Sequence, residues 1–308
     1  MPRGLDTSSK YYRLCKPLYG LASAPVRWFD HISQLSRLHT FKSSWHPCLF
    51  YASDQEGGFE AIVCVFVDDL KVFCKSETFI KELMKQMETE SVKITVGHHG
   101  RYLGMKWNFD LSKRTCTVSR QEYIQKIAEG FGMSDYKPIG TPAETNSHLS
   151  KHETEEKHPL YAKLVGKLMF AINTRFDIAY SVKELARHLH RNGDLHRKAA
   201  KRVSQYLKGT ANVPLLLRAC EGNKITLSAF TDAAWKQGGT GRGTSGGVLA
   251  IRKSAIAMLS QTQHCVTLSS CEAEIYAGIT LAMEVVYYRR ILEEMGIEQL
   301  EPTVIWTD

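Results

Sequence analysis

Alternating apolar and polar positions predict short helices and strands in mixed order over the first 140 residues. Trp28, Phe29 and Ile32 recur on one helical face, which favours a helix from about Val26 to Leu38. Similar patterns predict a strand over 48–52, strands over 61–67 and 70–73, a helix over 79–87, a hairpin over 102–109 and 115–118, and a helix over 121–131. This order is typical of an α+β fold.

The pattern changes after residue 140. Residues 141–159 are polar and carry almost no apolar side chain, so we expect a linker there. Three basic amphipathic helices are predicted within 160–222, followed by glycine-bounded strands from 225, a long helix from Glu272 to Met295 and a strand over 303–308. The chain is therefore expected to have three structured parts, at 1–140, 160–222 and 223–308, with an α+β / α/β architecture.

Composition excludes several classes of protein. The 308 residues are 43% hydrophobic and 23% charged, as in an ordinary globular protein of two or three domains. The longest apolar run, Ala61–Val67, is far shorter than the ~20 residues that cross a bilayer, and no signal peptide pattern is present. Eight cysteines include no CxxC pair. We therefore expect an intracellular protein, cytoplasmic or nuclear, without membrane association.

The positive charge is concentrated in one segment. Net charge is +8, and residues 160–210 hold 11 of the 40 basic but only 3 of the 32 acidic side chains, so the remainder is balanced. Such a segment suits a polyanion, although a solvated helical face gives the same composition. The candidate phosphate-binding side chains are Lys183, Arg187, Arg191, Arg197, Lys198, Lys201, Arg202 and Lys208.

Two groups of carboxylates are candidates for metal binding. Asp68 and Asp69 lie at the predicted turn between two apolar strands, where a divalent cation would offset their mutual repulsion, although aspartate is also common in ordinary turns. Asp232, Glu274 and Asp308 follow or lie on separate predicted elements and could together hold two ions for phosphodiester chemistry.

The residues alone leave the helical member of this second group open. Glu272 and Glu284 lie on the same predicted helix as Glu274. Ser269 and Ser270 can also be helix caps, followed by acids that favour a first helical turn. The pattern therefore does not decide whether these acids bind a metal or begin a helix.

Ordered motifs give the chain a family resemblance. They are Leu18–Pro25, Phe66–Asp69, Tyr102–Gly104, Thr141–Pro142, Tyr161–Gly166, Thr174–Ile178, Tyr206–Thr210, Thr231–Trp235, Thr244–Gly246, Leu268–Glu274 and Ile305–Asp308. In this order they resemble the reverse transcriptase and ribonuclease H region of copia-type LTR retrotransposon Pol polyproteins. The resemblance implies a partial reverse transcriptase palm and thumb-like region over 1–140, a helical connection over 160–222, and a ribonuclease-H-like domain with a mixed five-stranded sheet over 223–308.

The resemblance also implies roles for the acids. Asp68 and Asp69 would bind Mg²⁺ (or Mn²⁺) in the palm, and Asp232, Glu274 and Asp308 would be the catalytic, metal-binding acids of ribonuclease H. The motif Ala273–Ala277 favours Glu274 over Glu272. The implied partners are an RNA·DNA hybrid or other nucleic acid, together with other Pol-derived chains.

Departures from the family pattern limit the expected activity. The third palm aspartate lies, in the family, before the segment that begins here at Met1, and the fourth ribonuclease H acid would follow Asp308. We therefore expect a chain truncated at both ends and inactive as a polymerase by itself. Two alternatives stay open: a non-catalytic nucleic-acid-binding or structural relic that uses 160–210, and a subunit completed by another chain.

Overall fold

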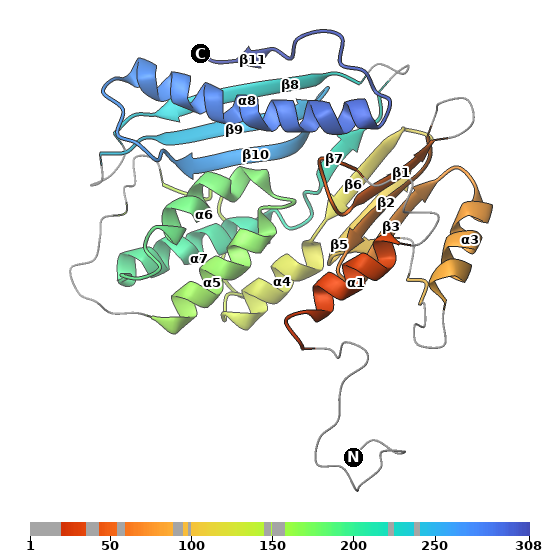
Figure 1. Cartoon of the computed structure of the whole chain (residues 1–308). Helices are drawn as coiled ribbons and strands as arrows, with labels where there is room; N and C mark the ends of the chain where they lie inside the picture. The colour runs from red at the N-terminus through yellow and green to blue at the C-terminus, as the bar shows by residue number, and fades with distance from the viewer. Residues whose placement is uncertain are drawn as a thin grey trace, which may run out of the picture. The chain divides into compact units, whose positions relative to one another are not determined.

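A computed structural model describes residues 20–34, 43–53, 59–88, 95–97, 100–144, 149, 158–220, 225–236 and 241–308. The chain divides into two compact units, 1–96 and 97–308 (Figure 1). Helices and strands are mixed in both units, which confirms the α+β prediction. None of the helices within these ranges is long and apolar enough to cross a membrane.

Within the described residues, the first unit is a three-stranded antiparallel sheet, in the order β1-β2-β3, with two helices. Its elements are α1 (Ala24–Ser33), β1 (Leu49–Ser53), β2 (Phe59–Phe66), β3 (Asp69–Cys74) and α3 (Glu77–Met87). Alternate residues of β2, Ala61, Val63 and Val65, are buried against Ile32 of α1 and against α3. The period of two in the apolar pattern therefore corresponds to one covered face of this sheet.

The second unit begins with a four-stranded antiparallel sheet that joins distant parts of the chain. Its order is β4-β5-β6-β7, with β4 (Arg101–Tyr102), β5 (Met105–Asp110), β6 (Thr115–Ser119) and β7 (Leu215–Arg218). Val118 on β6 pairs with Leu215 on β7, nearly 100 residues later. The predicted hairpin is confirmed as β5 and β6, whereas the pairing with β7 has no signal in the local sequence pattern.

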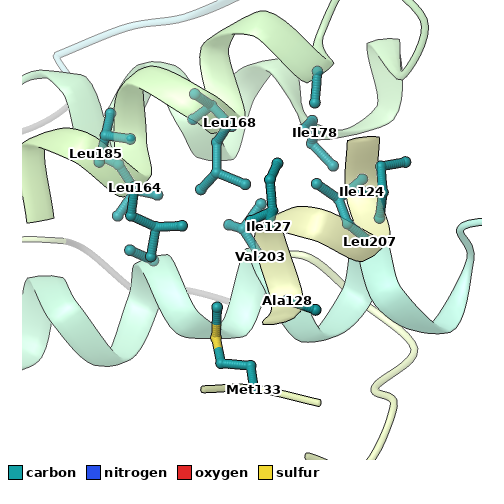
Figure 2. Close-up of a cluster of buried hydrophobic side chains, with 14 of the residues drawn as sticks. Ile124, Ile127, Ala128, Met133, Leu164, Leu168, Ile178, Leu185, Val203 and Leu207 are labelled. Atoms are coloured by element: carbon teal, nitrogen blue, oxygen red, sulfur yellow. The ribbon is translucent and has the colours of Figure 1, made fainter. Parts of the chain in front are cut away.

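Four helices between β6 and β7 share one apolar core. They are α4 (Gln121–Gly130), α5 (Pro159–Ala171), α6 (Ala179–Ala186) and α7 (Asp194–Gly209), with a short 3₁₀ helix, η1 (Phe176–Ile178), before α6. Figure 2 shows Ile127 from α4, Leu168 from α5 and Val203 from α7 pointing into the same cluster. The apolar stripes predicted for the basic helices therefore pack against one another.

The last part of the second unit is a mixed sheet in the order β10-β9-β8-β11. Its strands are β8 (Leu227–Ala234), β9 (Thr244–Ile251), β10 (Ser254–Thr262) and β11 (Ile305–Trp306). Helix α8 (Ser270–Glu294) packs on β8 and β9 through Leu281 and Val285, and in Figure 1 it runs along those strands, in front of the sheet. Four strands lie within the described residues, so the five-stranded sheet stays a prediction.

Several predicted boundaries differ from the structure. Helix α1 ends at Ser33, and the predicted continuation through Leu38 lies outside the described residues. Most of the predicted linker over 141–159 also lies outside them. The predicted C-terminal strand is only two residues long. The sequence-based division at residues 140, 159 and 222 stays a prediction. Strand β7, which lies in the predicted helical connection over 160–222, joins the sheet of residues 101–119.

Candidate metal centre

Two of the candidate carboxylates are placed by neighbouring parallel strands. Ile305 of β11 pairs with Ala229 of β8, and Trp306 pairs with Phe230. Continuing this register by two residues places Asp308 beside Asp232. Because residues in register on parallel strands point to the same side, the two carboxylates meet at one edge of the sheet.

The third carboxylate comes from the start of α8. Ser269 is the N-cap, and its hydroxyl accepts a hydrogen bond from the Glu272 N–H at 3.1 Å. The Glu272 carboxylate accepts from the Leu268 N–H at 2.6 Å, so Glu272 is used in capping. Glu274, two residues further, accepts from the Ala233 N–H at 3.1 Å and thus faces the end of β8.

The three side chains form a compact cluster. One carboxylate oxygen each from Asp232, Glu274 and Asp308 lies within 4.8 Å of the others. Glu274 is half-buried, whereas the two aspartates are exposed. Burial raises the pKa of Glu274, and the nearby Asp232 and Asp308 carboxylates raise it further. The predicted convergence of these three acids is therefore found in the structure.

The donor set fits a hard divalent cation. Carboxylate oxygens are the ligands that Mg²⁺ and Mn²⁺ prefer, and exposed aspartates leave coordination positions open to substrate or water. Glu274 Oε2 is buried and has no hydrogen-bond partner among the described residues, so one buried oxygen is available for a ligand. This cluster is the single group of three potential metal ligands found in the described ranges.

The other predicted pair, Asp68 and Asp69, lies at the tip of the β2–β3 hairpin. Phe66 pairs with Asp69, so Val67 and Asp68 form the turn. The sequence pattern placed both aspartates in this turn, whereas Asp69 is the first residue of β3. Both aspartates are exposed. Within the residues that the structure describes, this pair does not belong to any group of three potential ligands.

The tip of this hairpin is held in an unusual backbone conformation. Val67 has φ 54°, in the left-handed region that β-branched residues rarely adopt. Its carbonyl accepts a hydrogen bond from the Trp28 indole N–H of α1 at 2.5 Å. Strained residues persist only where their surroundings over-determine them, and they are frequent at functional sites. The sequence pattern placed Trp28 on the apolar face of a helix, but it predicted neither the hydrogen bond from Trp28 to Val67 nor the backbone strain at Val67.

Most of the predicted phosphate-binding residues make contacts within the protein. Lys183 and Arg187 pair with Glu184, Arg197 with Asp194 and Arg202 with Glu144, while Lys208 donates to the backbone carbonyls of Ser134 and Tyr136. These partners reduce the charge that is available to an external phosphate.

Three predicted cations remain exposed on this segment, namely Arg191, Lys198 and Lys201. Lys198 and Lys201 form no ion pair within the described ranges. Both line a cavity of about 380 Å³, whose wall includes Tyr136 and Tyr180. The Lys201 ammonium also lies 6.0 Å from the centre of the Tyr136 ring. Of the eight predicted phosphate-binding side chains, these three are therefore the exposed ones.

Comparison with known proteins places this chain in a class. Residues 2–145 match the family model described as Reverse transcriptase (RNA-dependent DNA polymerase). The Retrovirus-related Pol polyprotein from transposon TNT 1-94 of Nicotiana tabacum is 31% identical over 98% of this chain and 24% of its own length. That from transposon RE2 of Arabidopsis thaliana is 29% identical over 96% of the chain and 20% of its own length. The Putative transposon Ty5-1 protein of Saccharomyces cerevisiae is 29% identical over 70% of both chains.

These matches identify a domain of the chain and the family to which the chain belongs. The chain contains a reverse transcriptase domain. More particularly, it is a member of the copia-type retrotransposon Pol family, as the sequence motifs indicated. It spans about a fifth to a quarter of the length of the two Pol polyproteins named above.

Proposed function

We propose that this chain is a retrotransposon-derived RNA-directed DNA polymerase and ribonuclease H fragment, and that its second unit acts on the RNA strand of an RNA·DNA hybrid. The observation that carries this proposal is the convergence of Asp232, Glu274 and Asp308 within 4.8 Å. The mixed sheet with a long helix on one face supports it, and a fifth strand would complete the expected ribonuclease-H-like sheet. The protein is proposed to act in the cytoplasm or nucleus, with other Pol-derived chains as partners.

Each residue of the cluster has a distinct part in this proposal. The exposed carboxylates of Asp232 and Asp308 would bind the ion from the solvent side, where a phosphodiester could approach. Glu274 would bind it from the helix side, while the Ala233 N–H fixes one of its oxygens. Mg²⁺ or Mn²⁺, when bound, supplies Lewis-acid activation of the phosphoryl group. Together, the three side chains would position one phosphate of the RNA strand.

Metal-dependent stabilisation tests the proposal. A ligand that binds only the folded state raises its stability by mass action, so millimolar Mn²⁺ should raise the thermal midpoint of the parent chain. Asp232→Asn should reduce that rise, because it removes one anionic ligand. The absence of a rise in the parent, or an equal rise in Asp232→Asn, would contradict the proposal.

The polymerase site has less support. Asp68 and Asp69 are proposed to bind a divalent ion in the palm, but the described residues do not bring a third potential ligand to them. We therefore expect the 308-residue chain alone to extend no primer with Mg²⁺ or Mn²⁺. Primer extension that disappears in Asp68→Asn would contradict this expectation.

A second candidate function is nucleic-acid binding without catalysis. It is favoured by Lys198 and Lys201, which are exposed at a cavity that also has tyrosines in its wall. Exposed lysines neutralise phosphates, and aromatic rings can stack on bases. Hybrid binding that is retained in Asp232→Asn, with no cleavage by the parent, would favour this function over the first.

A further inference from the structure

The loop between β10 and α8 contains a buried amide that lies behind the candidate metal centre. Gln263 is 0% exposed, and its backbone N–H donates to the Gly243 carbonyl at 2.9 Å. Buried amides occur where their hydrogen bonds are satisfied, because an unpaired polar group in the interior is costly. The hydrogen bonds of the Gln263 side chain therefore show which elements it connects.

The Gln263 amide forms hydrogen bonds to α8, which carries Glu274, and to β9, which pairs with β8. Its Nε2 donates to the Ala273 carbonyl at 2.9 Å, in the first turn of α8 and next to Glu274. The same nitrogen donates to Ser245 Oγ on β9 at 3.1 Å. Ser245 pairs across the sheet with Ala233, whose N–H donates to Glu274. One amide thus connects the helix that carries Glu274 with the strands beside it.

Gly243 and Thr267 lie directly against this amide. A Cβ atom at Gly243 would lie 2.5 Å from Gln263 Oε1 and 2.9 Å from the Ala234 carbonyl oxygen, so a side chain there would displace the amide or the strand. The Thr267 hydroxyl donates to Gln263 Oε1 at 3.5 Å, and the Trp235 indole N–H donates to the Thr267 carbonyl at 2.9 Å. The loop is therefore fixed to the end of β8 as well, three residues beyond Asp232.

We propose that Gln263 is a positioning residue of the metal centre: its amide fixes the first turn of α8 against β8 and β9 so that Glu274 reaches Asp232 and Asp308. This inference rests on the proposed function, because it requires the carboxylate cluster to bind a cation. Gln263 does not touch the ion or the substrate. Groups that orient metal ligands typically change metal affinity about 10- to 100-fold when they are mutated.

The isosteric substitution Gln263→Glu tests this role. A carboxyl group has at most one O–H to donate, and none when it is ionised, so it cannot donate to both the Ala273 carbonyl and Ser245 Oγ as the amide does. The measurement is the Mn²⁺ dissociation constant, obtained by electron paramagnetic resonance at a temperature where circular dichroism shows the variant folded. We expect a rise of about 10-fold or more.

Gln261→Glu is the matched control, because it makes the same chemical change two residues earlier, on a half-exposed position of β10. Its Mn²⁺ affinity should equal that of the parent. Gln263→Met provides a second variant, which keeps the side-chain length and adds no charge, and it should also weaken binding.

The outcomes separate this inference from the proposed function. If the parent does not bind Mn²⁺, both the metal centre and the role of Gln263 are wrong. If the parent binds and folded Gln263→Glu and Gln263→Met bind equally well, only the role of Gln263 is wrong. If neither variant folds, the residue serves stability rather than positioning, and the inference is again overturned.

Discussion

At the scale of single residues, the Asp68–Asp69 hairpin combines two adjacent charges with a backbone that a valine seldom adopts. The left-handed conformation of Val67 costs roughly 1–2 kcal/mol for an L-residue with a Cβ atom. The Trp28 indole, bonded to the Val67 carbonyl, is a contact that helps to hold this conformation.

The first prediction concerns Val67→Gly. Glycine adopts positive φ without steric cost, and Val67 is 55% exposed, so little apolar burial is lost. The substitution should raise the free energy of unfolding of the first unit by about 1 kcal/mol, measured by urea denaturation.

The control is Val26→Gly, on an exposed position of α1 with ordinary helical backbone. This change should lower stability, because glycine is unfavourable within helices by about 1 kcal/mol relative to alanine. A loss of stability in both variants would mean that the Val67 backbone is not strained.

At the scale of elements, two buried histidines lie where α7 packs beside the end of α6. The ring centres of His188 and His196 are 4.4 Å apart. The Gly193 N–H donates to His196 Nδ1 at 3.1 Å, so this nitrogen is unprotonated. Burial lowers the pKa of His188 to about 4, and the neighbouring His196 and Arg187 act in the same direction, against the opposing effect of Glu184.

The second prediction is an acid-dependent loss of stability from this contact. The ordinary pKa of histidine, about 6.5, is higher than the folded-state value, so the unfolded chain binds more protons between pH 6.5 and 4. The stabilising contribution of neutral His188 is thus complete above about pH 6.5 and decreases as the pH falls towards 4. Urea denaturation across this range should show a shallower decrease for His188→Gln than for the parent.

His190→Gln is the control, since His190 is exposed and only two residues away. It should follow the pH profile of the parent. Identical profiles for the parent and His188→Gln would show that His188 does not titrate differently in the folded state.

The helices and strands that follow from the local spacing of apolar residues were predicted from the sequence, whereas contacts between distant segments were not. The spacing of apolar residues predicted the β2–β3 hairpin, α4 and α8, because burial of one face produces a regular period. The family motif favoured Glu274 over Glu272, and the hydrogen bond from the Leu268 N–H to the Glu272 carboxylate agrees with it, although residue types alone do not specify that bond. The partners of the basic residues come from distant segments, as with Arg202 and Glu144, and so have no local signal. Gln263 was missed for the same reason.

At the scale of the whole molecule, the structure changes the expectation for nucleic-acid binding. Five of the eight candidate cations already contact carboxylates or carbonyls of the described residues. Counting all eight would therefore overestimate the number of phosphates that this segment neutralises. Lys198 and Lys201 are the pair with exposed charges and no ion pair to a described residue.

The third prediction follows from this pair. Binding to duplex or hybrid should be independent of sequence and should weaken with salt, because phosphate contacts release counterions. Replacing Lys198 and Lys201 together by alanine should reduce the slope of log K against log salt by about 2, at roughly 0.9 per phosphate. Fluorescence anisotropy with a labelled hybrid at several salt concentrations measures this slope.

The control replaces Lys81 and Lys85 of α3, which are exposed and change the net charge equally. Their double alanine variant should retain the parent slope. Equal reductions in both double variants would show that net charge, rather than this surface, determines the salt dependence.

The pairing of β6 with β7 has a consequence for how such chains can vary. Val118 and Leu215 are neighbours on adjacent antiparallel strands, so the polypeptide that forms the four-helix group leaves and re-enters the sheet at almost the same point. A turn of about two residues could in principle close this gap. The helical group therefore begins and ends at neighbouring positions of one sheet, so its length could change among relatives while the path of the strands stays the same.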